Sequence, residues 1–302
     1  MRTVMIGSRG SRLALIQAEY VISKLKEAAP DFNYEIKIIQ TSGDKWQGVG
    51  LAGIGGTGVF TKEIENALLS GEIDAAVHSM KDLPTTITAG LTIAAIMERE
   101  DPRDVLVAKA PVTLGTLPQG AMLGTGSLRR IAQLRYLRPD LVFEPLRGNL
   151  DTRLRKLDEG NYSGLLLAFA GMKRMGWERY VTQVFSFDTC LPAAGQGALG
   201  VEIRSDDQEI AGLLLSLDHL PTHAAVLAER AFLGRVGGGC HVPIGALAEV
   251  NGNEIHLRGI IAALDGSKLL RGEEVGSLQQ AKEVGIELGE RLLSKGGGAI
   301  LE

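Results

Sequence analysis

The stretch Asp74-Ala75-Ala76-Val77-His78-Ser79-Met80-Lys81-Asp82-Leu83-Pro84 decides the fold class, because a short apolar run leads directly into a cationic and an anionic side chain. The run is short enough for a buried strand. Pro84 cannot continue a sheet and pushes Leu83 toward an extended or turn conformation, so the strand should end at Lys81 and Asp82. Ligands bind at the carboxyl ends of strands in open α/β sheets, which makes Asp82 the first candidate for chemistry. Taken by itself, the stretch favours the simpler interpretation of a Lys-Asp pair in an exposed turn.

Length and composition indicate a multidomain chain rather than a membrane or nucleic-acid-binding protein. The 302 residues are too many for one ordinary core and predict two or three domains. No apolar run approaches the roughly 20 residues that span a bilayer, and residues 1–7 lack the cleavage pattern of a signal peptide. We therefore expect a cytoplasmic protein. The net charge of −4 speaks against nucleic-acid binding.

The two cysteines, Cys190 and Cys240, are too few for a disulfide framework and lie in no CxxC pattern, so no metal site is expected. Cys240 follows the three glycines 237–239, where a thiol would be accessible, and it is a candidate for function. Cys190 has the apolar neighbours of a buried, inert cysteine. His241 adjoins Cys240, but neighbouring side chains diverge in an extended loop, so a Cys-His protease pair is not implied.

The first part of the chain predicts a layered α/β domain. Strands are expected over residues 4–7 and 34–40, with helices from about residue 12 and over 61–69. The turn Gly7-Ser8-Arg9-Gly10-Ser11-Arg12 enters the first helix. It is suited to bind an anion through free backbone N–H groups and the helix dipole, although a simple N-cap by Ser11 explains it equally well.

Residues 41–60 form a glycine-rich segment, with seven glycines among the sixteen residues 43–58. Such a segment cannot hold a strand or helix. It is expected to be a mobile loop and a lid over the site. A connection without a role is the alternative, although loops of this length are uncommon in compact domains.

A second α/β domain repeats this pattern and carries a basic bias. Residues 127–174 contain eight arginines and two lysines against five acidic residues. Strands expected near 104–108, 121–124, 141–145 and 165–170 are mostly followed by arginines. Guanidinium forks bind carboxylate or phosphate groups bidentately, which favours a ligand with several acidic groups over a solvated basic face. The arginines placed at strand ends are Arg129, Arg130, Arg147, Arg153 and Arg174, whereas Arg135, Arg138 and Arg155 are expected to face water.

The rest of the chain predicts a return to the first sheet and then a smaller domain. A Pro/Gly segment at 191–198 precedes a strand over 199–204 that is expected to rejoin the first sheet. Beyond about 217, a helix, three strands joined by Asn-Gly and Asp-Gly turns and a last helix predict an α+β domain with an antiparallel sheet. The expected domains are 1–98 with 198–216, then 99–197, then 217–302.

Five motifs in register make the chain resemble the porphobilinogen deaminase family, also called hydroxymethylbilane synthases. They are Ala76-Val77-His78-Ser79-Met80-Lys81-Asp82, Gly126-Ser127-Leu128-Arg129-Arg130, Leu146-Arg147-Gly148-Asn149, Pro192-Ala193-Ala194-Gly195-Gln196-Gly197-Ala198 and Gly238-Gly239-Cys240-His241-Val242-Pro243-Ile244-Gly245. The resemblance implies two domains like periplasmic binding proteins and a third that carries the cofactor cysteine. It implies an enzyme of tetrapyrrole (heme, chlorophyll, cobalamin) biosynthesis that joins four porphobilinogen molecules head to tail, releasing ammonia and hydroxymethylbilane.

The resemblance also implies the functional residues. A dipyrromethane cofactor would be attached to Cys240 through a thioether and act as a primer, and Asp82 would be the catalytic carboxylate. The residues implied in cofactor binding are Lys81, Thr125, Ser127, Arg129, Arg130, Arg147, Arg153 and Gln196. Those implied in substrate binding are Arg9, Ser11, Arg147, Arg153 and Arg174. A monomer is expected, since no apolar stretch is left over for an obvious interface.

The chain departs from the family pattern in the glycine-rich loop, where Gly53 and Thr57 stand at positions that are commonly lysine. Two other functions fit parts of the sequence. A solute-binding protein would share the two-lobed architecture, and a phosphate-ligand enzyme would use the helix N-termini, although the P-loop and Rossmann spacings are missing. Neither explains a cysteine in a triple-glycine loop.

Overall fold

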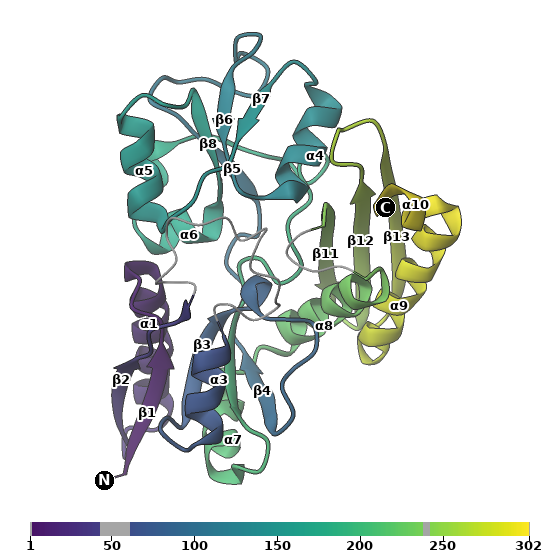
Figure 1. Cartoon of the computed structure of the whole chain (residues 1–302). Helices are drawn as coiled ribbons and strands as arrows, with labels where there is room; N and C mark the ends of the chain where they lie inside the picture. Colours follow the sequence, from purple (N-terminus) through teal and green to yellow (C-terminus); the bar gives the residue numbers. More distant parts are fainter. Residues whose placement is uncertain (1, 43–60, 238–241, 302) are drawn as a thin grey trace. The chain divides into compact units, whose positions relative to one another are not determined.

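The computed structural model describes residues 2–42, 61–237 and 242–301, and these form two compact units (Figure 1). Unit 1 comprises residues 1–99 and 198–223, and unit 2 comprises residues 100–197 and 224–302. The chain passes between the units three times. This division is coarser than the three domains predicted from the sequence, whose boundaries stay a prediction.

Unit 1 is built on a five-stranded mixed sheet with the strand order β2-β1-β3-β10-β4. Strands β1, β2 and β3 are parallel, and β10 is antiparallel to both of its neighbours. The strand expected to return to the first sheet is therefore confirmed. Helix α7 was not predicted, because seven residues are too few to show a helical period. The elements are β1 (Thr3–Ser8), α1 (Arg12–Ala28), β2 (Asn33–Ile38), α3 (Lys62–Leu69), β3 (Ala75–Ser79), the 3-10 helix η2 (Met80–Asp82), β4 (Leu91–Ile96), β10 (Leu199–Arg204) and α7 (Gln208–Leu214).

Unit 2 contains a second five-stranded sheet of the same design, in the order β7-β6-β8-β5-β9. Here β5 is the antiparallel strand, as β10 is in unit 1. In both sheets the reversed strand is the first one after a passage from the other unit. The elements are β5 (Asp104–Val107), β6 (Met122–Gly124), α4 (Leu128–Leu137), β7 (Val142–Glu144), α5 (Leu150–Asp158), β8 (Gly164–Ala168), α6 (Phe169–Arg174) and β9 (Val181–Val184).

The C-terminal part of unit 2 is a three-stranded antiparallel sheet, β11-β12-β13, packed against helices (Figure 1). Gly252 has a φ of +63° in the predicted turn between β11 and β12, a conformation that favours glycine. Two mixed α/β sheets and a C-terminal antiparallel sheet with helices are present, as the predicted fold class requires. The elements are α8 (Leu220–Arg235), β11 (Ile244–Asn251), β12 (Glu254–Ala262), β13 (Leu269–Ser277), α9 (Ala281–Leu292) and α10 (Gly298–Leu301).

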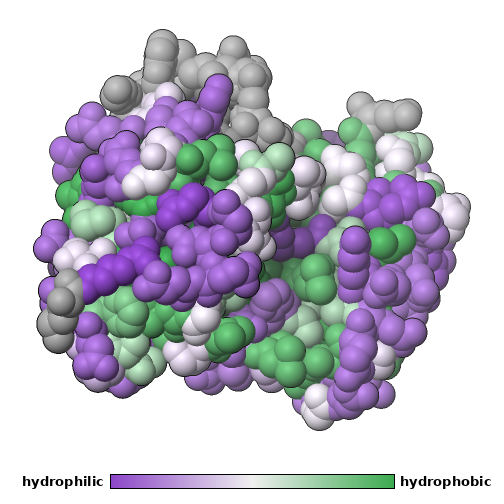
Figure 2. Space-filling model, turned by 90° about the horizontal axis from the view of Figure 1, so that it is seen from below, coloured by the Kyte–Doolittle hydropathy of each residue, from purple (hydrophilic) through white to green (hydrophobic). Residues whose placement is uncertain are grey.

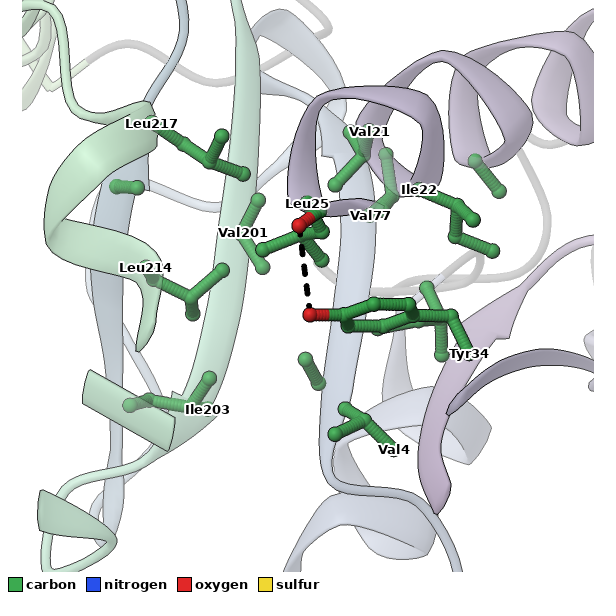
Figure 3. Packing of buried hydrophobic residues seen from close by; sticks show 14 of the residues in the cluster. Val4, Val21, Ile22, Leu25, Tyr34, Val77, Val201, Ile203, Leu214 and Leu217 are labelled. Atoms are coloured by element: carbon green, nitrogen blue, oxygen red, sulfur yellow. Dashed lines mark hydrogen bonds between the residues drawn. The ribbon is translucent and has the colours of Figure 1, made fainter. Parts of the chain in front are cut away.

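The core of unit 1 lies between one face of its sheet and helix α1 (Figure 3). Val21 and Leu25 of α1 pack against Val77 of β3 and Val201 of β10, and all four side chains are buried. The Tyr34 hydroxyl donates to the Ala29 carbonyl at 2.9 Å, at the C-terminal end of α1. This packing fixes the first turn of α1 relative to the ends of β1 and β3, where the predicted site residues lie.

Helices α8 and α9 of unit 2 approach closely at Gly285, and this contact gives a first prediction. A Cβ atom at Gly285 would lie 2.2 Å from the Ala228 carbonyl oxygen. Gly285→Ala should therefore force the helices apart and destabilise the protein by about 1–3 kcal/mol. Gly212→Ala is the matched control, since α7 has open space at that position and alanine is the better helix former by about 1 kcal/mol. Thermal unfolding should show opposite shifts, and equal shifts would contradict the packing argument.

Candidate active site and anion-binding residues

Asp82 lies in a cavity at the carboxyl edge of the unit 1 sheet, as the sequence predicted. It follows β3 in η2, and Leu83 is extended with φ −81° and ψ 136° before the proline. The Asp82 side chain is exposed and lines a cavity of about 80 Å³. The polar residues around this cavity are Arg9, Ser11, Gln17, Thr61, His78, Ser79 and Asp82.

The turn before α1 forms the expected N-cap, and its anion-binding role stays a prediction. The Ser11 hydroxyl is the N-cap of α1 and accepts from the Ala14 N–H at 3.3 Å. Arg9 and Ser11 also line the Asp82 cavity. The first turn of α1 therefore brings a cation and a hydroxyl to the same cavity as the carboxylate.

Sequence reasoning missed Gln17, Thr61 and His78 as lining residues. The Gln17 amide donates to the Ser79 hydroxyl at 3.1 Å, and both belong to the cavity wall. Gln17 is buried although amide side chains are mostly exposed. Gln17 is a polar residue on the apolar face of α1, but such residues are too common to predict a site.

A second group of predicted residues gathers at the carboxyl edge of the unit 2 sheet. Thr125 and Ser127 follow β6, where the Thr125 hydroxyl accepts from the Ser127 N–H at 3.2 Å and Ser127 caps α4. Arg147 follows β7 and Arg174 ends α6, which follows β8 directly. Because parallel strands end at one edge, the sheet brings these groups together.

Arg147, Arg153 and Arg174 are partly exposed, and two of them also fix the backbone. Arg153 donates from Nε to the Gly148 carbonyl at 2.8 Å, and Gly148 has a φ of +106°. Arg174 donates from Nη2 to the Gly197 carbonyl at 2.7 Å. A guanidinium has five N–H donors in all, so holding a carbonyl does not by itself prevent it from binding a carboxylate.

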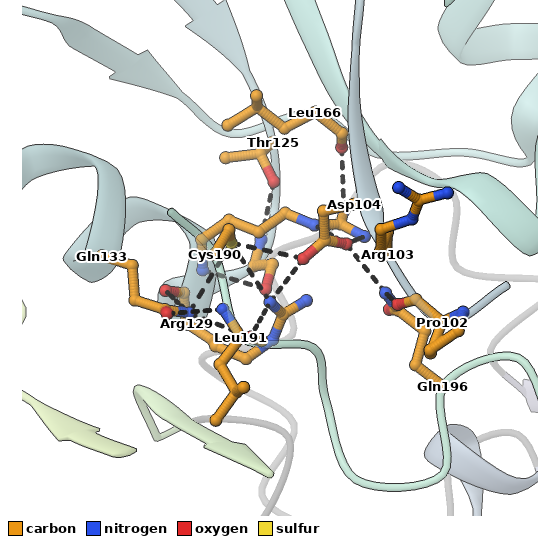
Figure 4. A network of polar contacts seen from close by, with 12 residues as sticks. Pro102, Arg103, Asp104, Thr125, Arg129, Gln133, Leu166, Cys190, Leu191 and Gln196 are labelled. Atoms are coloured by element: carbon orange, nitrogen blue, oxygen red, sulfur yellow. Dashed lines mark hydrogen bonds and ion pairs between the residues drawn. The ribbon is translucent and has the colours of Figure 1, made fainter. Parts of the chain in front are cut away.

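Arg129 and Arg130 are instead buried around a carboxylate that sequence reasoning missed, Asp104 (Figure 4). Arg129 Nη1 lies 2.5 Å from Asp104 Oδ2, and Arg130 Nη2 lies 2.7 Å from Oδ1. Gln196 Nε2 donates to Oδ1 at 2.9 Å, and the Cys190 thiol contacts Oδ2 at 3.3 Å. The sequence did contain a sign of this buried carboxylate, since Asp104 begins a strand whose other residues are all apolar.

Opposing effects set the electrostatics of this network. Burial by itself would raise the pKa of Asp104, but the charges and hydrogen bonds of Arg129 and Arg130 outweigh burial and hold the pKa well below its usual value. The pKa of the Cys190 thiol is raised to about 12, mainly by burial and to a smaller extent by the charge of Asp104. Asp104 is therefore ionised, and Cys190 is the inert thiol that the sequence predicted.

Two of the three arginines expected to face water bind backbone carbonyl groups instead. Arg138 has a side chain only 23% exposed and donates to the Leu114 carbonyl at 2.6 Å. Arg135 donates to the Leu264 carbonyl at 2.9 Å. Helical spacing cannot reveal contacts with distant loops, which is why these predictions were wrong. Arg155, with a side chain 70% exposed, follows the prediction.

Some predicted residues carry no structural description. Cys240 and His241 lie outside the described ranges, as do Gly53, Thr57 and the rest of residues 43–60. Lys81 precedes Asp82 in η2 and is partly exposed. The proposed lid and the cofactor cysteine therefore remain predictions.

Fold and site together are typical of an α/β enzyme that binds a ligand with several acidic groups. Arginines at the ends of three neighbouring strands of one sheet suit such a ligand, and the carboxylate in the unit 1 cavity can stabilise positive charge that develops in a reaction.

Comparison with known proteins identifies the family. Residues 4–212 match the model "Porphobilinogen deaminase, dipyromethane cofactor binding domain", and residues 223–294 match "Porphobilinogen deaminase, C-terminal domain". The porphobilinogen deaminase of Carboxydothermus hydrogenoformans is 52% identical over 301 residues, covering 100% of this chain and 97% of that protein. That of Nostoc sp. is 48% identical over 303 residues, covering 99% and 94%. The chain belongs to the porphobilinogen deaminase family.

The family resemblance stated from the motifs is thus confirmed, and with it the activity. The chain is a deaminating transferase, a hydroxymethylbilane synthase that uses a dipyrromethane cofactor and serves tetrapyrrole biosynthesis. Among solved structures, the periplasmic VFT2 domain of Bordetella pertussis BvgS is 14% identical with a TM-score of 0.45, covering 71% of this chain and 86% of that chain. A putative methionine-binding lipoprotein from Bacillus subtilis is 13% identical with a TM-score of 0.44, covering 72% and 91%. The fold assignment rests on the strand order and not on these two similarities.

Proposed function

We propose that Asp82 is the catalytic carboxylate of this transferase. Loss of ammonia from the aminomethyl group of porphobilinogen leaves a methylene-pyrrolenine cation. A carboxylate can accept a hydrogen bond from the pyrrole N–H and stabilise that cation. The observation that carries the proposal is that Asp82 lines a cavity together with Arg9 and Ser11. These two can bind a substrate carboxylate while Asp82 faces the ring.

We infer that the arginines of unit 2 hold the carboxylates of the dipyrromethane and of the growing chain. The donor set fits this ligand, since Arg147, Arg153 and Arg174 are partly exposed and follow neighbouring strands. Thr125 and Ser127 add hydroxyl groups at the same edge. When bound, the dipyrromethane supplies the pyrrole carbon to which the first substrate is joined. The chain's contribution is to bind and orient its acid groups.

Arg129 and Arg130 take different parts in this proposal. The hydrogen bonds of Arg129 described above run through Nη1 alone, so its Nε and Nη2 groups are donors for a ligand carboxylate. Arg130 uses Nε, Nη1 and Nη2 for Asp104 and the Leu166 carbonyl. We therefore assign Arg130 and Gln196 to positioning, and Arg129 to direct binding. Lys81, next to Asp82, stays in the proposed cofactor-binding set.

The intact mass of the purified protein, with Cys240→Ala beside it, tests the covalent attachment. The wild type should exceed its polypeptide mass by two deaminated porphobilinogen units, because Cys240 is proposed to hold the dipyrromethane through a thioether. Cys240→Ala should have the bare polypeptide mass, and Cys190→Ala, which removes the inert thiol, should keep the excess. A wild-type mass that stays bare after incubation with porphobilinogen would favour a solute-binding protein instead.

We also propose that the protein is a cytoplasmic monomer that binds neither nucleic acid nor membranes. Figure 2 shows hydrophilic residues over much of the visible face, with hydrophobic residues between them. In the described part of the chain no single helix has the length and apolar character to cross a membrane, and one sharply bent helix pair passes that test only when combined. Size-exclusion chromatography with light scattering tests the monomer, and a dimer mass would refute it.

A further inference from the structure

Unit 1 contains a buried histidine–carboxylate pair that the proposed function does not use. His78 of β3 and Glu202 of β10 approach to 3.1 Å between Nε2 and Oε2. Their side chains are 6% and 0% exposed. Glu202 is the one charged residue in the otherwise apolar run 199–203. Carboxylates are almost never fully buried unless they are paired. This pattern therefore indicated a buried partner for Glu202, and sequence reasoning overlooked it.

The register of β3 and β10 places the two side chains next to each other. His78 stands opposite Gly200, and Glu202 stands opposite Ala76, so both side chains project from the same face of the sheet as diagonal neighbours. The small residues opposite them leave room, and a Cβ at Gly200 would lie 2.2 Å from the Met80 sulfur. The pair is therefore held in a confined space beneath η2, which carries Asp82.

Stability alone does not account for the pair. Among the described residues, neither carboxylate oxygen of Glu202 nor Nε2 of His78 has a well-directed hydrogen bond. Burying such a charge costs several kcal/mol, and apolar residues of similar volume are often more stable there. The elements packed on this face offer apolar side chains, Ile64 and Leu68 of α3 and Ile93 of β4. A charge retained in such surroundings needs another reason.

The reason lies in the cavity, because His78 lines it together with Asp82. The other charged lining residue is Arg9. The Glu202 carboxylate lies 3.1 Å from Nε2, and its negative charge favours the tautomer with the proton on Nε2, which leaves the lone pair of Nδ1 as an acceptor. Because Nε2 is next to Glu202, Nδ1 is the ring nitrogen left to interact with a molecule bound beside Asp82.

We propose that His78 is a second catalytic residue, a base whose Nδ1 removes the proton released at each addition, and that Glu202 is its positioning residue. This inference rests on the proposed role of Asp82. Each addition forms a carbon–carbon bond and breaks a carbon–hydrogen bond at the α-position of a pyrrole ring. The electron pair of the broken bond returns to the ring, and the proton goes to Nδ1. It then passes to the ammonia lost from the aminomethyl group, which leaves as ammonium.

Substitution of the base is the first test. His78→Gln should lower kcat by about 10²-fold with a much smaller change in KM, because the lost group acts on a proton and not on the substrate's carboxylates. Porphobilinogen deuterated at its free α-carbon should then show a primary isotope effect in His78→Gln that exceeds that of the wild type, since proton removal has become slow. An unchanged kcat, or a lower kcat without the isotope effect, would overturn the proposal.

Substitution of the positioning residue gives a readout that does not depend on turnover. Glu202→Gln keeps the side-chain shape and should lower kcat by about tenfold. The ¹⁵N resonances of the His78 ring, assigned by their absence from His78→Gln, should show the Nε2–H tautomer in the wild type and a mixture in Glu202→Gln. If the tautomer is the same in both proteins, Glu202 does not position His78 and the proposal fails, whatever the activity of either variant.

The chain offers a matched control in another histidine–carboxylate pair. His256 Nε2 and Glu273 Oε2 are also 3.1 Å apart, but they lie on β12 and β13 with side chains 35% and 69% exposed. His256→Gln should leave kcat and the isotope effect unchanged. A wild-type protein that does not consume porphobilinogen would refute the proposed function. If the wild type is active and His78→Gln has the same kcat, only this inference is refuted.

Discussion

Replacing Asp82 by asparagine should lower the turnover of porphobilinogen by about 10²- to 10⁴-fold. The amide has the same shape and can still accept a hydrogen bond from a pyrrole N–H. It offers no negative charge to the cation that remains after ammonia leaves, and that charge is what the reaction requires of this position. Because Asp82 is exposed on η2, the change should not disturb folding.

Release of ammonia from porphobilinogen, measured at saturating substrate, gives the size of the effect. Asp31→Asn is a suitable control, since Asp31 is an exposed aspartate of unit 1 between α1 and β2 and should leave turnover unchanged. Asp82→Glu keeps the charge but displaces it, so it should recover part of the loss. Turnover of Asp82→Asn equal to that of the wild type would remove Asp82 from the mechanism.

Replacing Asp104 by asparagine should produce the largest loss of stability, about 3–5 kcal/mol. Arg129 and Arg130 are 4% and 6% exposed, and both form ion pairs with Asp104, which Figure 4 shows within its polar network. Asparagine would leave two buried guanidinium charges without the carboxylate that neutralises them. Removing one partner of a buried pair costs far more than the pair itself contributes.

The stability lost in Asp104→Asn should depend on pH, and the direction of this dependence can be checked. The pKa of Asp104 is lowered in the folded protein, so its stabilisation is present above the unfolded-state pKa of about 3.9 and is lost as the pH falls through the folded value. Unfolding by urea should therefore show a wide gap between wild type and Asp104→Asn at neutral pH and a narrower gap in acid.

Asp140→Asn is the matched control for Asp104→Asn. Asp140 binds Arg138 with two contacts of 2.7 Å, a similar geometry, but its side chain is 25% exposed. Water can solvate the arginine left behind, so the unfolding midpoint should move much less. Equal shifts for both variants would show that burial does not control the energetics of the Asp104 network.

Local patterns were enough to predict most of the fold. The run before Lys81 and Asp82, the Ser11 cap and the strand at 199–204 each depend on neighbours in sequence, and the structure has a strand, a cap and a returning strand there. Edge strand β9 was missed because its four residues are all half-buried and show no alternation. Arg135 and Arg138 were misplaced because each also binds a carbonyl that is distant in the chain, that of Leu264 and that of Leu114.

The sequence by itself determined the chemistry, and the tertiary structure decided which polar groups are paired. The five motifs identify the family and place Asp82 and the arginines, since strand ends and helix starts are local features. Whether Arg130 binds a ligand or Asp104 depends on a contact across 26 positions. The meeting of His78 and Glu202 depends on the pairing of β3 with β10. Burial and charge pairing are properties of chain segments brought together from distant positions, so only the folded chain defines them.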